Sequence, residues 1–141
     1  CVMTNRDLQL IIKDQDPVTL GSTATVQQAC QRMWERRVGA VLVVDNGRLV
    51  GIFTGRDAVH TLADGRNPVD TTLSDVMTCN PNTIAPTAKA IDALRQMCDC
   101  GFRHLPIVDN EKVIGIVSRG DFKGLELDRL EEEIGFWERI C

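Results

Sequence analysis

The sequence lacks the features of a membrane, secreted or nucleic-acid-binding protein. No apolar run in its 141 residues approaches the roughly 18 residues that a membrane span needs. No positively charged segment leads into an apolar stretch, so we see no secretory signal and expect a cytoplasmic protein. The formal net charge is −4, which argues against non-specific nucleic-acid binding because phosphate contacts need clustered Lys and Arg. We therefore expect neither nucleic acid nor membrane among its partners.

Histidine and patterned cysteine are also scarce. His60 and His104 are the only histidines, and neither belongs to a recognisable Ser-His-Asp or Cys-His signature, so the sequence does not predict an enzyme. Cys98, Cys100 and His104 lack the paired spacing of a zinc site, and we predict no metal. The six cysteines do not resemble a disulfide scaffold, and Cys30 lies in an apolar helical pattern, so reduced thiols are expected.

What the sequence does contain is an internal duplication. Residues 17–57 align on residues 81–121 without a gap when the chain is displaced by 64 positions. The identities include the tripeptide Val-Asp-Asn at 44–46 and 108–110. With 43% hydrophobic residues the chain can bury a core, so two copies of a small α/β unit are predicted.

Each copy predicts the same order of elements: strand, helix, strand, strand, helix. The apolar spacing that predicts the first helix occurs in both copies, and Thr23 and Thr87 are expected to cap these helices. Turn residues separate the two strands that follow. The predicted parts are a first repeat at 8–63, a linker at 64–80, a second repeat at 81–126 and a helical tail at 127–141. Together they predict an α/β (α+β) fold.

The most specific signal is a heptapeptide at the junction of the last strand and the last helix of each copy. It reads GIFTGRD at 51–57 and GIVSRGD at 115–121. A hydroxyl residue three positions before an acidic one is typical of a helix N-cap. Asp is shorter than the Glu or Gln that closes a capping box best, which leaves the aspartates under-explained. A helix N-terminus with a hydroxyl and a nearby arginine, Arg56 or Arg119, also suits a phosphate, and a carboxylate one turn on suits sugar hydroxyls.

These motifs, with DVMT at 75–78 and RHLPIVDN at 103–110, give the chain a resemblance to a tandem pair of CBS domains, often called a Bateman module. The resemblance covers about residues 8–126, and small stand-alone bacterial CBS proteins are similar. It implies two repeats packed with pseudo-symmetry and adenosyl ligands bound in clefts between them. It also implies a homodimer.

The resemblance further implies a role for each matching residue. Asp57 and Asp121 are expected to bind ribose hydroxyls, and Thr54 and Ser118 are expected to bind phosphate. Thr19 and Thr83 would flank the base, with Ile52 and Ile116 near the adenine face. The segment before the central strand also faces the ligand, which adds Val38, Gly39 and Ala40 in the first repeat and Phe102, Arg103 and His104 in the second.

The two sites are not expected to be equivalent. Gly39 and Ala40 stand where the second repeat has Arg103 and His104, so the second set should hold the more negative end of a ligand. AMP, ADP, ATP, NAD(H) and S-adenosylmethionine all fit the resemblance. The predicted function is a regulatory sensor that signals through conformational or oligomeric change; the alternative is a ligand-independent dimerisation module that acts through a partner protein.

Two aromatic residues have structural interpretations. Trp34 lies one residue past an apolar helical stripe, so partial packing is expected. Trp137 belongs to an apolar stripe in the tail with Leu127, Leu130 and Ile134, on a segment that is otherwise mostly charged. Such a helix usually docks on a protein surface, and a second subunit is the favoured one.

Overall fold

The computed structural model describes residues 7–12, 15–101, 103–118 and 121, except for the side chains of Cys98 and Cys100. The chain divides into two compact units. One comprises residues 16–81 with 111–113, and the other comprises residues 1–15, 82–110 and 114–141. The division follows the duplication seen in the sequence, apart from short exchanged segments.

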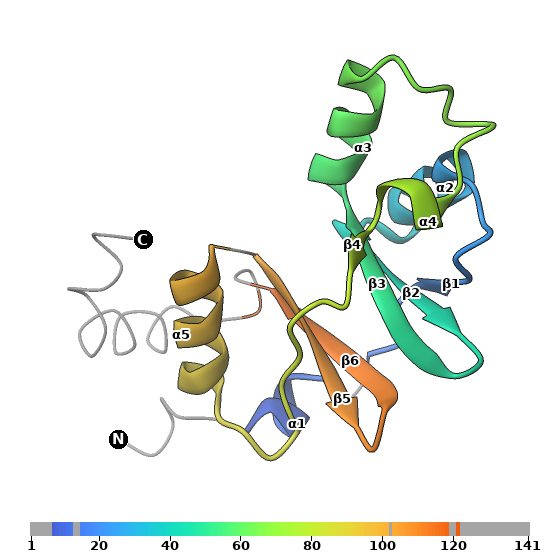
Figure 1. Cartoon of the computed structure of the whole chain (residues 1–141). Helices are drawn as coiled ribbons and strands as arrows, with labels where there is room; N and C mark the ends of the chain where they lie inside the picture. The colour runs from blue at the N-terminus through green and yellow to red at the C-terminus, as the bar shows by residue number, and fades with distance from the viewer. Residues whose placement is uncertain (1–6, 13–14, 102, 119–120, 122–141) are drawn as a thin grey trace. The chain divides into compact units, whose positions relative to one another are not determined.

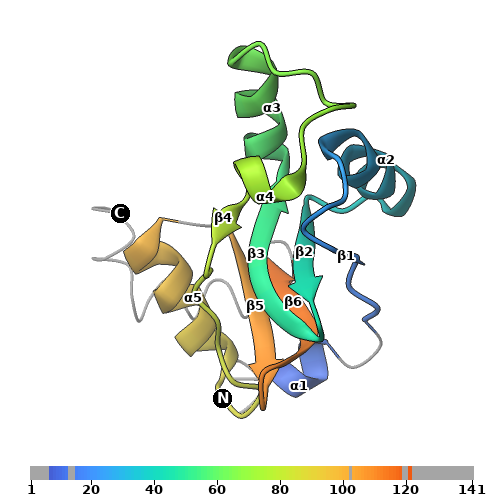
Figure 2. The same cartoon turned by 45° about the vertical axis from the view of Figure 1, so that its right-hand side comes forward.

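The first unit holds the complete first copy of the repeat (Figure 1). Its elements are β1 (Thr19–Leu20), α2 (Val26–Arg36), β2 (Ala40–Asp45), β3 (Arg48–Thr54) and α3 (Gly55–Ala63), followed by α4 (Leu73–Val76) and β4 (Thr78–Cys79). The sheet order is β1-β2-β3-β4, with β1 parallel to β2 and the other pairs antiparallel. Helices α2 and α3 lie toward the end of the β2–β3 hairpin remote from its turn (Figure 2). The predicted strand-helix-strand-strand-helix order is confirmed here.

The second copy repeats these elements at the same displacement of 64 residues. Its helix α5 spans Ala90–Cys100, and its hairpin consists of β5 (His104–Asp109) and β6 (Lys112–Ser118). The strand that would match β1 is reduced to a parallel bridge between Ile84 and Ile107. The predicted last helix of this copy, and the tail with Trp137, lie outside the described residues. The predicted α/β fold is confirmed.

The helix caps differ from the prediction. The N-cap of α2 is Thr25, whose hydroxyl accepts from the backbone N–H of Gln28 while the Gln28 side chain accepts from the N–H of Thr25. Helix α5 begins at Ala90, so Thr87 stands three residues before it. The assignment of Thr23 and Thr87 as caps was wrong because the chain makes a turn at Ser22–Ala24 before the helix starts. Gln28 three residues after Thr25 is the signal that could have found the right cap.

Two short segments are exchanged between the copies. Helix α1 (Leu8–Ile11) precedes the first copy but packs in the core of the second, where the N–H of Leu8 donates to the carbonyl of Ala88. Helix α4 precedes the second copy but packs in the core of the first, where Leu73 makes the matching bond to Ala24. Both α4 and β4 fall within the predicted linker at 64–80. Four-residue helices carry too little periodicity to be predicted.

The glycine that opens each heptapeptide makes room for these exchanged segments. A Cβ at Gly115 would lie 2.8 Å from both Cβ and Cγ2 of Ile12, just after α1. A Cβ at Gly51 would overlap the side chain of Met77, just after α4, and lie 3.0 Å from the carbonyl oxygen of Thr78. The repeated glycine therefore has a packing role.

Each unit has its own apolar core. In the first, Val41, Val43 and Phe53 of the sheet pack with residues of α2 and with Leu73 of α4. In the second, Leu105, Ile107 and Val117 pack with α5 and with Leu8 and Ile12 of the exchanged segment. Trp34 is an exception to the predicted packing, because its side chain is 85% exposed on α2. No helix in the described part of the chain combines the length and the apolar character required to cross a bilayer.

Candidate functional site

The first heptapeptide forms a closed capping box at the junction of β3 and α3. The Oδ2 atom of Asp57 accepts from the backbone N–H of Thr54 at 2.9 Å and from its hydroxyl at 3.1 Å. The Thr54 hydroxyl accepts from the N–H of Asp57 at 3.4 Å. Asp57 therefore does reach back to the N-cap, so the capping role accounts for this aspartate more fully than its short side chain indicated. The Thr54 backbone is extended, at φ −118° and ψ 171°, as is usual for an N-cap residue.

The strand register gathers the other predicted residues of this repeat on one face of the sheet. Thr19 lies opposite Leu42, and Leu42 lies opposite Ile52. Ala40 lies opposite Thr54 at the end of the same two strands. Because side chains directly opposite one another share a face and alternate residues along a strand return to it, these side chains share one face.

The same face extends to Thr78, which is not among the predicted site residues. Thr78 of β4 lies opposite Ile52, so its side chain shares that face. Thr78 is exposed, and it ends the DVMT segment that was assigned to the linker. A β-branched residue such as Thr78 is typical of a strand, but the local sequence does not indicate that this strand pairs with β3.

The loop before β2 approaches the beginning of α3. The carbonyl of Gly39 accepts from the backbone N–H of Gly55 at 3.2 Å. Val38 and Gly39 are exposed, and Arg56 is an exposed cation in the first turn of α3. The structure therefore brings the predicted loop next to the predicted phosphate end of the site, as a local arrangement within the first unit.

The second heptapeptide forms a similar arrangement. The Oδ2 atom of Asp121 accepts from the N–H of Ser118 at 2.7 Å and lies 3.4 Å from its hydroxyl oxygen. Thr83 is exposed and Ile116 is half-buried. Phe102 and Arg119 lie outside the described residues.

His104 distinguishes the second repeat from the first. Burial lowers the pKa of its imidazole below the ordinary value of 6.5, and the nearby Arg103 lowers it further, while Asp121 acts in the opposite direction. The structure thus brings the predicted residues His104, Arg103 and Asp121 into electrostatic contact. An anion bound here would oppose the effect of burial by favouring the imidazolium.

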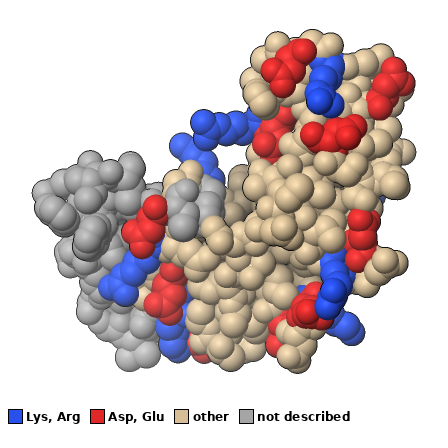
Figure 3. Space-filling model, viewed as in Figure 1, with Lys and Arg blue, Asp and Glu red and all other residues tan. Residues whose placement is uncertain are grey.

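Charges of both signs are interspersed on the molecular face drawn in Figure 3, where Lys and Arg lie among Asp and Glu. Among the described residues, no group of three or more His, Cys, Asp or Glu side chains could hold a metal ion. His60 is exposed on α3.

Comparison with known proteins identifies the repeat. The family model described as "CBS domain" matches this chain twice, at residues 7–64 and 73–127. The chain belongs to the CBS domain family. The resemblance inferred from the two heptapeptides is confirmed, and the matched ranges include α1 and α4 as well as the elements of the predicted repeats.

Curated CBS domain proteins include both long and short relatives. The chain is 43% identical over 102 residues to the CBS domain-containing protein CBSCBSPB2 of Arabidopsis thaliana, covering 71% of this chain and 19% of that protein. The chain thus spans about a fifth of the length of this plant relative. It is 38% identical over 104 residues to the CBS domain-containing protein YhcV of Bacillus subtilis, covering 73% of this chain and 74% of that protein.

Solved structures share the fold. The CBS domain pair of protein MJ0100, in complex with 5-methylthioadenosine and S-adenosyl-L-methionine, matches with a TM-score of 0.72 and 25% identity, covering 85% of this chain and 91% of that chain. A CBS domain protein from Pyrobaculum aerophilum, complexed with AMP, matches with a TM-score of 0.80 and 23% identity over 90% of this chain and 98% of that one. At that identity, the second match carries only the fold.

Proposed function

We propose that this chain is a regulatory module that binds an adenosine-containing ligand and has no catalytic activity of its own. The observation that carries the proposal is the repeated pair of a hydroxyl residue and an aspartate at the end of β3 and of β6. In the first repeat this pair borders a sheet face that bears Thr19 and Ile52. A sugar-binding carboxylate beside an apolar and hydroxyl-bearing sheet face is suited to a nucleoside.

Asp57 retains hydrogen-bonding capacity for such a ligand. Both bonds that its side chain makes to Thr54 use Oδ2, and Oδ1 has no partner in the described part of the chain. A carboxylate accepts through both oxygens, so Oδ1 could accept from a ribose hydroxyl without dismantling the capping box. Thr54 and Arg56, at the positively polarised N-terminus of α3, would then face a phosphate or another anionic group.

The second repeat would bind the more negative ligand end. His104 and Arg103 add two nitrogen-bearing side chains where the first repeat has Ala40 and Gly39. Because burial holds His104 toward its neutral form, binding of a phosphate would require it to take up a proton or to donate as neutral imidazole. We infer unequal affinities for the two repeats.

The ligand class is supported by the MJ0100 domain pair, which was crystallised with 5-methylthioadenosine and S-adenosyl-L-methionine. AMP, ADP, ATP and NAD(H) share the adenosine moiety and belong in the same test. A ligand that binds one conformation or oligomer better than another would shift the population toward it, which is how the signal would be transmitted.

We also propose that the module acts as a homodimer. Exposed apolar side chains occur on both α2 and α3, namely Trp34, Val59 and Leu62. Helices α2 and α3 contact one another, and an apolar patch on two neighbouring helices would suit an association surface. A regulated partner protein would read the ligand-dependent state of this dimer.

The alternative function is a ligand-independent assembly module. The observation in its favour is the closed capping box, because Asp57 already stabilises α3 without any ligand. Thermal unfolding with AMP, ATP, NADH and S-adenosylmethionine tests the choice. At about a hundred times its Kd, a ligand adds roughly 2.7 kcal/mol of stability, which raises the melting temperature by several degrees. No shift with any of these ligands would favour the assembly module.

A further inference from the structure

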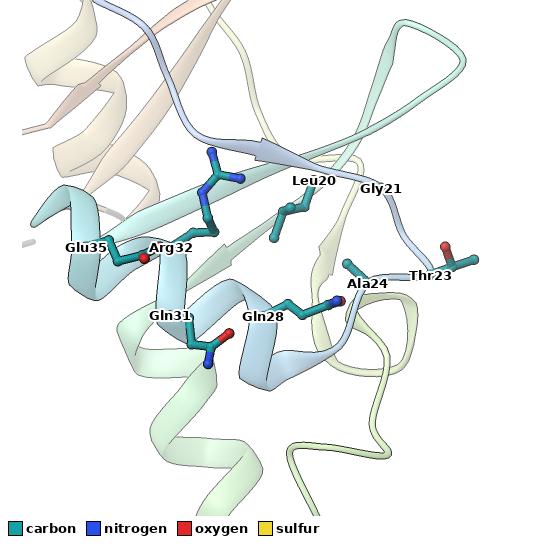
Figure 4. A pocket seen from close by; sticks show the side chains of 8 residues that line it. All are labelled: Leu20, Gly21, Thr23, Ala24, Gln28, Gln31, Arg32 and Glu35. Carbon is teal, nitrogen blue, oxygen red and sulfur yellow. The ribbon is translucent and has the colours of Figure 1, made fainter.

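A second pocket lies on the helical side of the first unit, away from the heptapeptide. It has a volume of about 580 Å³ and runs between β1 with its following turn and one face of α2 (Figure 4). Its lining consists of Leu20, Gly21, Thr23, Ala24, Gln28, Gln31, Arg32 and Glu35. None of these residues belongs to the candidate nucleotide site, and the volume is within the range of small-molecule sites.

Strand β1 separates the two sites. Thr19 and Leu20 are consecutive residues of a strand, so their side chains point to opposite faces of the sheet. Thr19 faces the candidate nucleotide site, whereas Leu20 points toward α2 and forms an apolar wall of the pocket (Figure 4). The turn after β1 is held by Ser22, whose N–H and hydroxyl donate to Asp45 at 3.0 and 2.5 Å.

Two unpaired charges of opposite sign border this pocket. Arg32 is half-buried and extends from α2 toward β1 (Figure 4). Within the described residues, neither Arg32 nor Glu35 has a hydrogen-bond or ion-pair partner, and the two do not pair with each other although they are three positions apart on one helix. The N–H donors of this guanidinium are available to a carboxylate that enters the open pocket.

The position that corresponds to Arg32 differs in the second repeat. The residue that corresponds to Arg32 is Gln96, which is also half-buried. Its Nε2 crosses from α5 and donates to the carbonyl of Thr83 at 3.3 Å. The first repeat lacks this bond and has a longer, charged side chain in its place, so the cation beside the pocket is specific to the first repeat.

We propose that this pocket binds a small zwitterion of the α-amino acid class, with its carboxylate on Arg32, its ammonium group on Glu35 and an aliphatic side chain against Leu20 and Ala24. The lining has one positive and one negative side chain, which suits a neutral ligand with separated charges. A phosphate dianion fits less well, since Glu35 would repel it. The ligand would contact the face of β1 opposite Thr19.

Chemical-shift mapping with L-leucine as the probe tests the proposal, and it requires no nucleotide. We expect titration at millimolar concentrations to shift the amide signals of Leu20, Gly21 and α2. Arg32→Gln should weaken binding about tenfold or more, as expected from the loss of a charged hydrogen bond. This variant should fold, because glutamine occupies the same position in the second repeat. Arg36→Gln is the matched control, since Arg36 lies on the same helix but bonds to Asp16 outside the pocket.

Two analogues test the zwitterion itself. Isoamylamine lacks the carboxylate of leucine and 4-methylpentanoate lacks the ammonium group, and both should bind more weakly than L-leucine. The proposal is overturned if L-leucine shifts none of these signals, if Arg32→Gln binds as the wild type does, or if either analogue binds as well as L-leucine. Asp57→Ala should leave leucine binding intact, which keeps this result independent of the nucleotide proposal.

Discussion

Replacing Gly115 by alanine is expected to destabilise the second unit by displacing the exchanged segment. The new Cβ would lie 2.8 Å from Cβ and Cγ2 of Ile12 and 3.0 Å from its Cδ1. Ile12 is buried and β-branched, so it cannot rotate all three atoms away. Inserting a methyl group into such packing costs about 1–3 kcal/mol. Urea unfolding followed by circular dichroism would measure this loss as a lower free energy of unfolding.

A double-mutant cycle identifies the cause. Ile12→Ala alone is expected to cost about 2–5 kcal/mol because it removes a buried side chain. In the double variant, two of the three clashing atoms are absent. Its loss of unfolding free energy should therefore be smaller than the sum of the two single losses by about 1 kcal/mol. Strictly additive costs would refute the packing of Ile12 on Gly115. Gly51→Ala offers a comparison, and a smaller cost is expected there because Met77 is flexible.

Three further predictions concern a buried histidine, a turn and a cap. The pKa of His104 is lowered in the folded state, so the unfolded protein binds more protons at this residue below pH 6.5. The free energy of unfolding should therefore fall as the pH drops below 6.5, and His104 should not affect it above that pH. A pH series of urea melts measures this dependence, and the contribution of His104 to it should be absent in His104→Gln. Glu111→Gly should stabilise the β5–β6 turn by about 1 kcal/mol, because Glu111 has φ 69°, a left-handed conformation that is costly for a residue with a Cβ. The first repeat has Gly47 at this position. An unchanged melting temperature would argue against backbone strain at Glu111. Thr25→Ala should cost about 1 kcal/mol, whereas Thr23→Ala should cost much less, and equal losses in calorimetry would contradict the assigned cap.

The repeated elements could be predicted because each carries its own periodicity. Helices α2 and α5 and the hairpins β2–β3 and β5–β6 occupy positions displaced by 64 residues, as the alignment of the two copies indicates. Asn46 and Gly47 have φ 53° and 78°, the conformation that the turn sequence predicts. Local sequence therefore determines these parts.

The exchanged segments and the second pocket could not be predicted in this way. Helix α1 is stabilised by burial of Leu8 against the second copy, more than 70 residues away in the sequence, and no local pattern encodes that contact. The pocket is lined by residues of β1, its following turn and α2, and its place follows from how these elements pack, which no local pattern encodes. Likewise, the sequence indicated that Asp57 could cap a helix but could not show that the box closes on one oxygen alone.

The central claim is that Asp57 binds a ligand as well as capping α3, and one substitution separates the two roles. Asp57→Glu keeps the carboxylate and the reach that a capping box requires, but moves the second oxygen away from its position beside β3. Calorimetric titration of S-adenosylmethionine, AMP and ATP into wild type and this variant is the most direct test. The account predicts binding by wild type, at least about tenfold weaker binding by Asp57→Glu, and similar melting temperatures for the two proteins. Equal binding by both proteins, or no binding of any of these ligands by wild type, would contradict it.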